Sequence, residues 1–272
     1  MLKLLLKEQK EVIGTWCILP SPEVVDLLTK TGLDFVIVDM EHGAIDLKTA
    51  QQMITAAQTN WCNGLIRVPK NLDYLISTSL DTGCNGIIVP HVKQMGDVEK
   101  IIKAAKYHPI GDRGFSPYIR GGDFGKMKDE KSTDVINQES IVGIIIEDEW
   151  GLRNVESIID NEFIDLVYVG TYDIAQTLGK SANHKDVFKI LEKTTKIIRD
   201  SNKSVGCLFH SKNELKKFSD VNEWGEVTED AEYDGRPVKL NNPTRGDVKK
   251  YKVYVKNEKG NVVKVEFGDP NM

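Results

Sequence analysis

The chain has 272 residues, of which 40% are hydrophobic and 28% are charged, and its formal net charge is −5. This is the composition of an ordinary globular protein, and the length suits one large α/β domain or one domain with an appendage. A net negative charge gives no overall attraction to nucleic acid or to an anionic membrane. No apolar run approaches the roughly 20 residues that span a bilayer, so we expect neither a nucleic-acid nor a membrane partner.

The first residues, MLKLLLKEQKEV, predict an amphipathic helix rather than a signal peptide, because charged residues follow the Leu run at once and no small-residue cleavage site follows. The four cysteines form no CxxC pair; they are Cys17, Cys62, Cys84 and Cys207. We therefore expect free thiols in a reducing cytoplasm rather than disulfides or a zinc site.

From residue 14 onwards, short apolar runs alternate with segments of helical periodicity. The runs lack a polar face, which is typical of strands buried on both sides. They lie at residues 14–19, 34–38, 65–68, 86–89, 141–146, 165–169 and 204–209. Helices are expected between them, for example at Leu47–Gln58 and Lys185–Asp200. This alternation predicts an α/β fold with a parallel sheet and right-handed crossovers.

Two regions depart from this rhythm. Residues 109–139 form a long excursion, and loops of this length are usually functional or disordered. Residues 221–248 are acidic and then rich in Gly, Pro and Asn, without helical or strand periodicity. After them, Tyr251–Val255 and Val262–Phe267 alternate on either side of a Gly-containing turn, which predicts a β-hairpin. We therefore interpret 221–272 as a linker and β-hairpin tail.

Charged residues stand where four of the predicted strands end. Glu41 and His42 follow the second strand, Arg67 ends the third, Glu147 follows the fifth and Asp173 follows the sixth. The carboxyl ends of parallel strands share one edge of the sheet, so these side chains should converge on one mouth. One charged strand end is usually a solvated rim, whereas four at the same edge indicate a site.

The residue types in this set indicate acid–base chemistry on an anion, close to a hard cation. Two carboxylates from neighbouring strands, with no Cys and no paired His nearby, favour Mg²⁺ or Mn²⁺, or Co²⁺, over structural zinc. Arg67 has the planar fork that suits a carboxylate or an enolate. Histidine is the side chain that titrates near neutrality, so His42 is the natural general base.

Six separated motifs carry a family resemblance: VDMEHG, the Arg67-Val68-Pro69 strand end, GIIVPHV, PIGDRGFSPY, IIIEDEWG and VGTYDIAQTLG. In order and spacing they resemble the metal-dependent HpcH/HpaI aldolases, which are class II pyruvate aldolases related to the citrate lyase beta subunit. The resemblance covers residues 1–218. It implies a TIM (β/α)₈ barrel that reversibly cleaves 4-hydroxy-2-oxo acids to pyruvate and an aldehyde.

The resemblance also implies a role for each candidate residue. Glu147 and Asp173 would ligate a divalent ion, Mg²⁺ or Mn²⁺ or Co²⁺, that acts as a Lewis acid on pyruvate. Arg67 would stabilise the enolate, and His42 would take the proton of the C4 hydroxyl, directly or through water. Asp81 matches a family carboxylate that raises the basicity of the histidine.

Other residues would complete the substrate pocket. The backbone at Tyr172 and Asp173, at a helix start, would hold the pyruvate carboxylate. Trp16 would line the pocket, with core packing as the alternative, and Asp39 would help to orient the site. His91 follows Pro90 at a strand end and is expected to be a structural or rim histidine. We expect a small-molecule 2-oxo acid substrate, a homo-oligomer and a cytoplasmic location.

Seven predicted strands are one fewer than a closed barrel needs. A short helix is expected at Lys212–Phe218, but no buried apolar run follows it before the tail. We therefore predict, for residues 1–220, a barrel that lacks its eighth βα unit. Its open edge would be covered by the tail, by a partner subunit or not at all, with lower stability and a tendency to associate.

Two further features separate this chain from the family pattern. Ile145 stands where many members carry a Gln that contacts substrate, and the segment from Gly235 onwards looks like one found near the end of tailed-phage structural or prohead proteins. Three functions therefore stay open. They are the metal-dependent aldolase, a related lyase on a CoA-linked substrate, and a non-catalytic or virion-associated protein that fuses a degenerate barrel to a structural tail.

Overall fold

The computed structural model describes residues 2–208 and the backbone of the strands at 230–233, 236–239, 244–245, 251–256 and 262–267. By its internal contacts the chain divides into two units, Met1–Leu208 and Phe209–Met272. Every residue that the sequence nominates for chemistry lies in the first unit. The predicted domain boundary at residue 220 and the predicted helix at Lys212–Phe218 lie outside the described residues.

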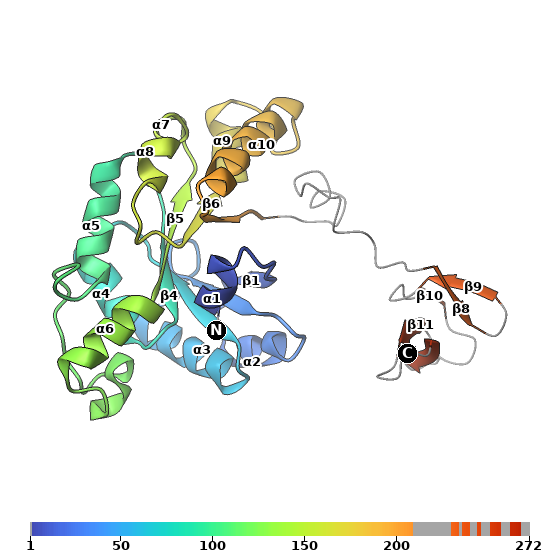
Figure 1. The fold of residues 1–272 in the computed structure, drawn as a ribbon, viewed down its shortest axis with the longest axis horizontal. Helices are drawn as coiled ribbons and strands as arrows, with labels where there is room; N and C mark the ends of the chain where they lie inside the picture. Colours follow the sequence, from blue (N-terminus) through green and yellow to red (C-terminus); the bar gives the residue numbers. More distant parts are fainter. Residues whose placement is uncertain are drawn as a thin grey trace. The chain divides into compact units, whose positions relative to one another are not determined.

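The first unit is built around a parallel sheet, which has seven strands in the order β1 to β7 among residues 2–208 (Figure 1). They are β1 (Gly14–Cys17), β2 (Phe35–Asp39), β3 (Asn63–Arg67), β4 (Gly86–Val89), β5 (Ile141–Ile146), β6 (Leu166–Val169) and β7 (Ser204–Gly206). All neighbouring strands pair in parallel. The predicted α/β class and the seven strands are confirmed, although β1 and β7 end earlier than expected.

Helices lie around the strands, on the outer side of the sheet except for α1, which lies at its amino edge (Figure 1). They are α1 (Leu2–Lys7), α2 (Pro22–Thr29), α3 (Leu47–Thr59), α4 (Asp73–Asp81), α5 (Met95–Ala105), the 3₁₀ turn η1 (Arg120–Gly125), α6 (Glu130–Glu139), α7 (Glu149–Arg153), α8 (Val155–Ile159), α9 (Thr171–Thr177) and α10 (Lys185–Asp200). The excursion at 109–139 therefore holds a helix and a turn, and its interpretation as a loop was wrong for this part.

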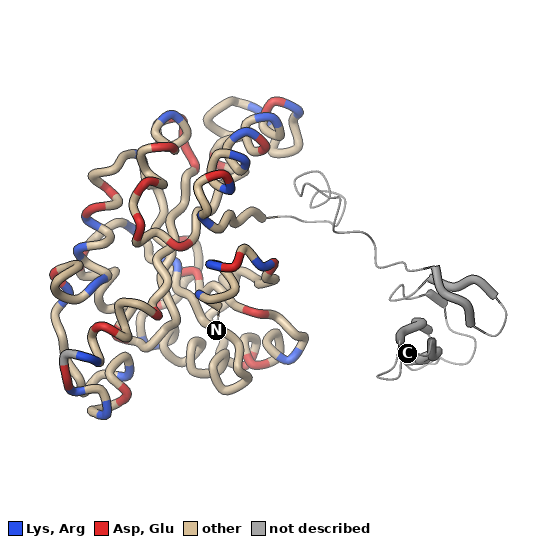
Figure 2. The backbone as a smooth tube through the Cα atoms, in the orientation of Figure 1, with Lys and Arg blue, Asp and Glu red and all other residues tan. Residues whose placement is uncertain are grey.

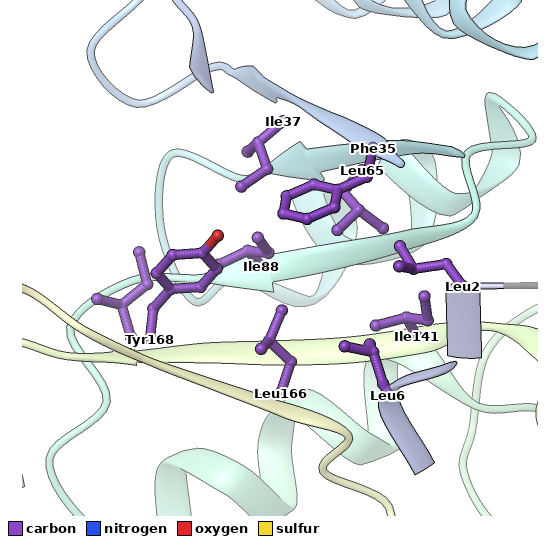
Figure 3. Close-up of a cluster of buried hydrophobic side chains, with 10 residues drawn as sticks. Leu2, Leu6, Phe35, Ile37, Leu65, Ile88, Ile141, Leu166 and Tyr168 are labelled. Carbon is purple, nitrogen blue, oxygen red and sulfur yellow. The ribbon is translucent and has the colours of Figure 1, made fainter. Parts of the chain in front are cut away.

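Alternate residues of the strands point into the interior of the curved sheet. Figure 3 shows one such cluster, in which strand side chains face two leucines of α1. Its buried members are Leu2, Leu6, Phe35, Ile37, Leu65, Ile88, Ile141, Ile145, Leu166 and Tyr168. Gly14 leaves the space that the Phe35 ring fills, because a Cβ there would lie 2.3 Å from that ring. The intervening strand residues, such as Val36 and Ile66, are also fully buried, which fits a sheet covered on its outer side.

The same alternation delivers polar side chains to the mouth. In β2 the inward positions are Phe35, Ile37 and then Asp39, and in β3 Leu65 is followed by Arg67. Asp39 and Arg67 are direct partners in the β2–β3 register. The inward set of β5 ends one residue past the strand, at Glu147. Because successive side chains of a strand point to opposite faces, every second residue points inward. These inward residues are apolar inside the sheet and charged at its carboxyl edge.

Helix α1, predicted from the first twelve residues, lies at the amino edge of the sheet. Ser204 Oγ of β7 donates to the Leu6 carbonyl at 2.8 Å, and Lys3 Nζ donates to the Ser140 carbonyl, also at 2.8 Å. Its Leu2 and Leu6 pack against the strand side chains at that end of the interior, as Figure 3 shows. Among the described residues β1 pairs with β2 alone and β7 with β6 alone, so these two strands form the edges of the sheet.

The second unit contains only antiparallel pairs among its described strands. The predicted hairpin is confirmed as β11 (Tyr251–Lys256) and β12 (Val262–Phe267), with β10 (Thr244–Arg245) beside β11. A second pair joins β8 (Asp230–Tyr233) to β9 (Arg236–Lys239). Residues 221–248 therefore contain strands that the sequence did not predict.

The eighth barrel strand was expected to be missing from residues 219–235. The part of that segment that the structure describes is β8, which pairs antiparallel with β9. The rest of the segment lies outside the described residues, so the missing eighth strand stays a prediction.

Surface charge on the first unit is mixed. In the view of Figure 2, Lys and Arg are interspersed with Asp and Glu over the outer helices and loops. The four cysteines are free, with Cys17 and Cys62 buried. A search of the described residues finds no helix both long and apolar enough to cross a bilayer.

Candidate active site

Arg67 is held in place at the carboxyl edge of the sheet, which we call the mouth. Its Nε donates to Asp39 Oδ1 at 2.8 Å, and its Nη2 donates to Asp39 Oδ2, so the pair is bidentate. The guanidinium lies over the Trp16 ring, 4.6 Å from the centroid. Trp16 also packs edge-on against Tyr168 of the interior cluster, with 5.3 Å between ring centroids. Trp16 thus packs between Tyr168 of the core and the guanidinium of Arg67.

Asp39 accepts hydrogen bonds from the loop after β2 as well as from Arg67. Its Oδ1 accepts the backbone N–H groups of Glu41 at 3.0 Å and of His42 at 3.2 Å. Burial raises the pKa of Asp39, but the hydrogen bonds and charge of Arg67 outweigh it and hold that pKa below its ordinary value. Asp39 therefore stays ionised at neutral pH and fixes the start of the loop that carries Glu41 and His42.

A line of charged side chains continues from Arg67 across the mouth. Arg67 Nη1 lies 3.2 Å from Glu41 Oε2, and Glu41 Oε1 lies 2.9 Å from His91 Nε2. His91 Nδ1 lies 2.8 Å from Glu147 Oε1, which also accepts the His91 backbone N–H at 2.7 Å. The ends of β2, β3, β4 and β5 are thereby joined in one network.

Glu147 is the most deeply buried carboxylate of this network apart from Asp39. Burial raises the pKa of Glu147; His91 and its N–H oppose that rise, while the charges of Asp173 and Glu41 add to it. Gly170, directly before α9, makes room for this side chain, because a Cβ there would lie 2.5 Å from the Glu147 Cβ. Asp173, three residues after Gly170 in the first turn of α9, is the second carboxylate, and its charge adds to the rise in the pKa of Glu147.

His42 and Asp81, both predicted as catalytic, lie in different surroundings. The His42 side chain is exposed at the mouth, directly after the loop that Asp39 anchors. Asp81 ends α4 and lies at the amino edge, where its Oδ1 accepts from Arg113 Nη2 at 2.7 Å. Helix α4 runs from the end of β3 at the carboxyl edge back to the start of β4 at the amino edge. Within one chain, Asp81 and His42 therefore lie at opposite edges of the sheet.

The structure brings together the other predicted residues. Arg67 and Glu147 belong to one charge network, with Trp16 under the arginine; Asp173 lies near Glu147, and Tyr172 stands beside it in the first turn of α9.

His91 was expected to be a structural or rim histidine, and the structure adds that its ring contacts two carboxylates of the network. A signal was present, because a histidine directly after a strand-ending proline stands at the same edge as the other candidates. What the sequence could not show is the positive φ of 58° at His91 that accompanies this placement.

The donor set fits a divalent ion by chemistry and charge. Glu147, Asp173 and Glu41 gather negative charge in a partly buried site, and Glu41 Oε2 has no hydrogen-bond partner although Arg67 lies within ion-pair distance. Carboxylate oxygens are the ligands that Mg²⁺ and Mn²⁺ prefer. Among the described residues no three His, Cys, Asp or Glu side chains are arranged to hold a metal ion, so the fit is one of residue type and charge and not of ligand geometry.

Comparisons with known proteins agree with the fold and the mouth. The model of the HpcH/HpaI aldolase/citrate lyase family matches residues 12–236. The hydroxypyruvate/pyruvate aldolase of Roseobacter denitrificans is 27% identical over 206 residues, 75% of this chain and 80% of that protein. The 5-keto-4-deoxy-D-glucarate aldolase of Klebsiella pneumoniae is 29% identical over 215 residues, 78% of this chain and 82% of that protein.

A solved structure agrees as well. The HpcH/HpaI aldolase of Desulfitobacterium hafniense superposes with a TM-score of 0.72 at 25% identity, over 79% of this chain and 85% of that one. The family match begins just before β1 and ends within β9, so it extends beyond the resemblance predicted for residues 1–218. Parallel sheet, charged mouth and family match lead to the same result: the chain belongs to the HpcH/HpaI aldolase/citrate lyase family.

Proposed function

We propose that the chain is a divalent-metal-dependent aldolase that cleaves 4-hydroxy-2-oxo acids to pyruvate and an aldehyde. Membership of an aldolase and lyase family supports carbon–carbon bond cleavage. The observation that supports the finer proposal is the mouth itself. It holds buried carboxylates for a cation at Glu147 and a clamped guanidinium for an anion at Arg67, joined in one network.

In this proposal the substrate lies between the two ends of the network. Glu147 and Asp173 would hold the ion, which when bound supplies a Lewis acid for the 2-oxo group. Arg67 cannot rotate freely, because Asp39 holds two of its nitrogens. Its third nitrogen, Nη1, is the donor directed away from Asp39, and it would stabilise the negative charge that develops on the enolate oxygen.

His42 would act on the other half of the substrate. Its exposed ring can reach a C4 hydroxyl at the mouth and accept its proton. The C4 oxygen then forms the aldehyde carbonyl, the C3–C4 bond breaks, and its electron pair passes into the pyruvate enolate. Protonation of C3 completes pyruvate. The backbone at Tyr172 and Asp173 is proposed to hold the substrate carboxylate, and Trp16 to line the pocket beneath Arg67.

Asp81 can support a histidine only from another copy of the chain. It lies at the amino edge beside Arg113, whereas His42 lies at the carboxyl edge. We therefore propose a homo-oligomer in which Asp81 of one copy approaches His42 of the next. If so, mixing inactive His42→Ala and Asp81→Ala proteins should restore part of the activity, since mixed sites regain both side chains. Failure to restore activity would remove Asp81 from the site.

The decisive experiment is a pyruvate-release assay on metal-stripped protein. Substrates should include 5-keto-4-deoxy-D-glucarate and a 4-hydroxy-2-oxo acid formed from pyruvate and a short aldehyde, in line with the names of the two aldolase relatives. We expect activity to disappear with EDTA and to return with Mn²⁺, Mg²⁺ or Co²⁺, and Glu147→Gln to remain inactive after the same treatment. Activity that survives EDTA, together with borohydride trapping of a pyruvate adduct, would contradict the proposal. Inactivity with every substrate and metal would instead favour the non-catalytic alternative.

A further inference from the structure

A pocket of about 210 Å³ lies at the amino edge of the sheet, the edge opposite the mouth. Asn85 and Ser140, which stand just before β4 and β5, form part of its lining. The other walls come from the end of α4, the turn η1 and α6. Pockets for drug-sized ligands usually measure roughly 300–1,000 Å³, so this pocket suits a smaller molecule.

Arg113 is the buried charged residue of the pocket wall, with a side chain that is 1% exposed. Its Nη2 donates to Asp81 Oδ1 at 2.7 Å, but its Nε has no hydrogen-bond partner among the described residues. Arg67 differs, because it uses both Nε and Nη2 for Asp39. A buried donor without an acceptor is unfavourable. An acceptor atom bound in the pocket would therefore stabilise Arg113.

Arg120 brings a second guanidinium to the pocket wall. Its Nη2 donates to Gln58 Oε1 at 2.7 Å, and its Nη1 donates to the carbonyls of Thr82 at 3.1 Å and Gly83 at 3.4 Å. These three acceptors are neutral, so they hold the guanidinium in place without neutralising its charge. Gly83 also makes room for it, because a Cβ there would lie 2.8 Å from Arg120 Nη1.

The two acidic residues of the lining are exposed. Asp123 pairs with Lys126 at 3.0 Å, and Glu139 is the last residue of α6. Water screens charges at exposed positions, whereas the charge of Arg113 is buried. Apolar side chains complete the lining; they belong to Leu80, Met127 and Ile136. The interior of the pocket thus combines positive charge with an apolar surface.

We propose that this amino-edge pocket binds a small carboxylate that carries a short apolar chain. One carboxylate oxygen would accept from Arg113 Nε, Arg120 would contribute its charge, and the chain would lie against the apolar lining. Guanidinium groups suit this task, because their planar donors match carboxylate oxygens. Inorganic phosphate could use the same donors but would leave the apolar lining uncovered. The inference goes beyond the proposed aldolase function and does not depend on it.

Methyl NMR of the full chain, labelled with [methyl-¹³C]methionine, tests the inference at two places. Met127 lines the pocket, and Met40 follows Asp39 at the mouth. Titration with butyrate should shift the Met127 signal saturably, with a Kd on the order of millimolar or tighter, and leave the Met40 signal in place. Butyramide, the neutral analogue, should shift neither signal. The variants Met127→Leu and Met40→Leu assign the two signals.

Two outcomes of this titration would overturn the inference. One is a Met127 signal that does not move with butyrate in the tens of millimolar, or that moves equally with butyramide. The other is a shift of Met40 without Met127, which would place the anion at the mouth. Inorganic phosphate should bind more weakly than butyrate, and tighter phosphate binding would contradict the assignment to a carboxylate.

Variants then identify the guanidinium groups. Arg120→Gln keeps an amide donor for the neighbouring carbonyls but loses the charge, so butyrate affinity at Met127 should fall about 10-fold or more. Arg113→Lys keeps the charge but lacks Nε, and a similar loss is expected. Arg153→Gln is the matched control, because Arg153 pairs with Glu149 on an exposed helix. Thermal unfolding checks that each variant is folded, and the Arg113 variant decides if the Arg120 variant is not. Wild-type affinity in a folded variant of either arginine would overturn the inference.

Discussion

Two arginines occupy similar surroundings at opposite edges of the sheet. Arg67, at the carboxyl edge, pairs with Asp39, and its guanidinium carbon lies 4.6 Å from the centroid of an aromatic ring. Arg113, at the amino edge, pairs with Asp81 and also lies 4.6 Å from a ring centroid, that of Tyr107. Both side chains are almost buried, so their local interactions alone do not distinguish a site from a structural contact.

The difference lies in what each pair is connected to. The neighbour of Arg113 at the amino edge is Lys106, whose Nζ donates to the Asn137 carbonyl and to the carbonyl and hydroxyl of Ser140, at 2.7–2.9 Å. The three N–H donors of Lys106 thus meet three acceptors, although Arg113 Nε itself has no hydrogen-bond partner among the described residues. Arg67 instead leads through Glu41 towards carboxylates whose negative charge is only partly compensated. Satisfied polar groups stabilise a fold, whereas uncompensated buried charges are typical of sites that bind ligands.

The largest loss of activity should come from replacing His42, although its side chain contributes little to the stability of the fold. Its side chain is exposed, so His42→Ala should leave the free energy of unfolding nearly unchanged. Loss of a general base should slow aldol cleavage about 10²–10⁴-fold. Decarboxylation of oxaloacetate moves no hydroxyl proton and should change little, which makes it the internal control. Equal losses in the two reactions would show that the assigned role is wrong.

Arg67→Lys should affect both reactions, because each passes through an enolate. The ammonium keeps a positive charge beside Asp39 but loses the fixed fork, so we expect kcat to fall about 10²–10³-fold for aldol cleavage and for decarboxylation. Arg153→Lys is the matched control, since Arg153 pairs with Glu149 on an exposed helix and should be neutral. Rates near wild type in Arg67→Lys would place enolate stabilisation elsewhere.

These effects concern residues that the sequence could nominate, and the reason is physical. A run such as Ile141–Ile146 has no polar face, so it must be buried on both sides, and a charge that follows it must lie at an edge. In a parallel sheet that edge is shared, which is why Arg67 and Glu147 could be grouped without a structure. The family match was predictable for a similar reason, because five of its six motifs are strand ends and only PIGDRGFSPY lies elsewhere.

Pairings across the fold could not be predicted in the same way. His91 meets Glu41 and Glu147 across 50 and 56 residues of sequence, and no local pattern encodes those contacts. Asp81 was assigned by its resemblance to a family carboxylate, but that resemblance does not say at which edge of the sheet its helix ends. Helix α6 and the strands at 230–239 were missed because their sequences carry too few apolar residues for a clear period.

At the amino edge, removal of Lys106 should reduce stability rather than activity. Lys106→Met leaves the Asn137 carbonyl buried without its donor, while the Ser140 carbonyl keeps a hydrogen bond from Lys3. We expect the free energy of unfolding to fall by about 1–3 kcal/mol, measured by urea denaturation. Lys103→Met, on the exposed face of α5, should change it by less than about 0.5 kcal/mol. Equal stability of the two variants would mean that the Lys106 hydrogen bonds contribute nothing.

The second expected effect of removing Lys106 is a pH dependence of that difference. Burial, reinforced by the charge of Lys3, lowers the pKa of Lys106 to about 7, from an ordinary value of 10.5. Between pH 7 and about 10 the unfolded chain therefore binds more protons at this residue than the folded chain does, so Lys106 makes the free energy of unfolding increase with pH. Below pH 7 both states are protonated and the slope disappears. Lys106→Met lacks this contribution, so the stability difference from wild type should widen from pH 7 to pH 9, while Lys103→Met should follow wild type. A difference that stays constant with pH would contradict this prediction. It would show that Lys106 stays charged in the folded protein despite its burial, because its three hydrogen-bond acceptors stabilise the ammonium group.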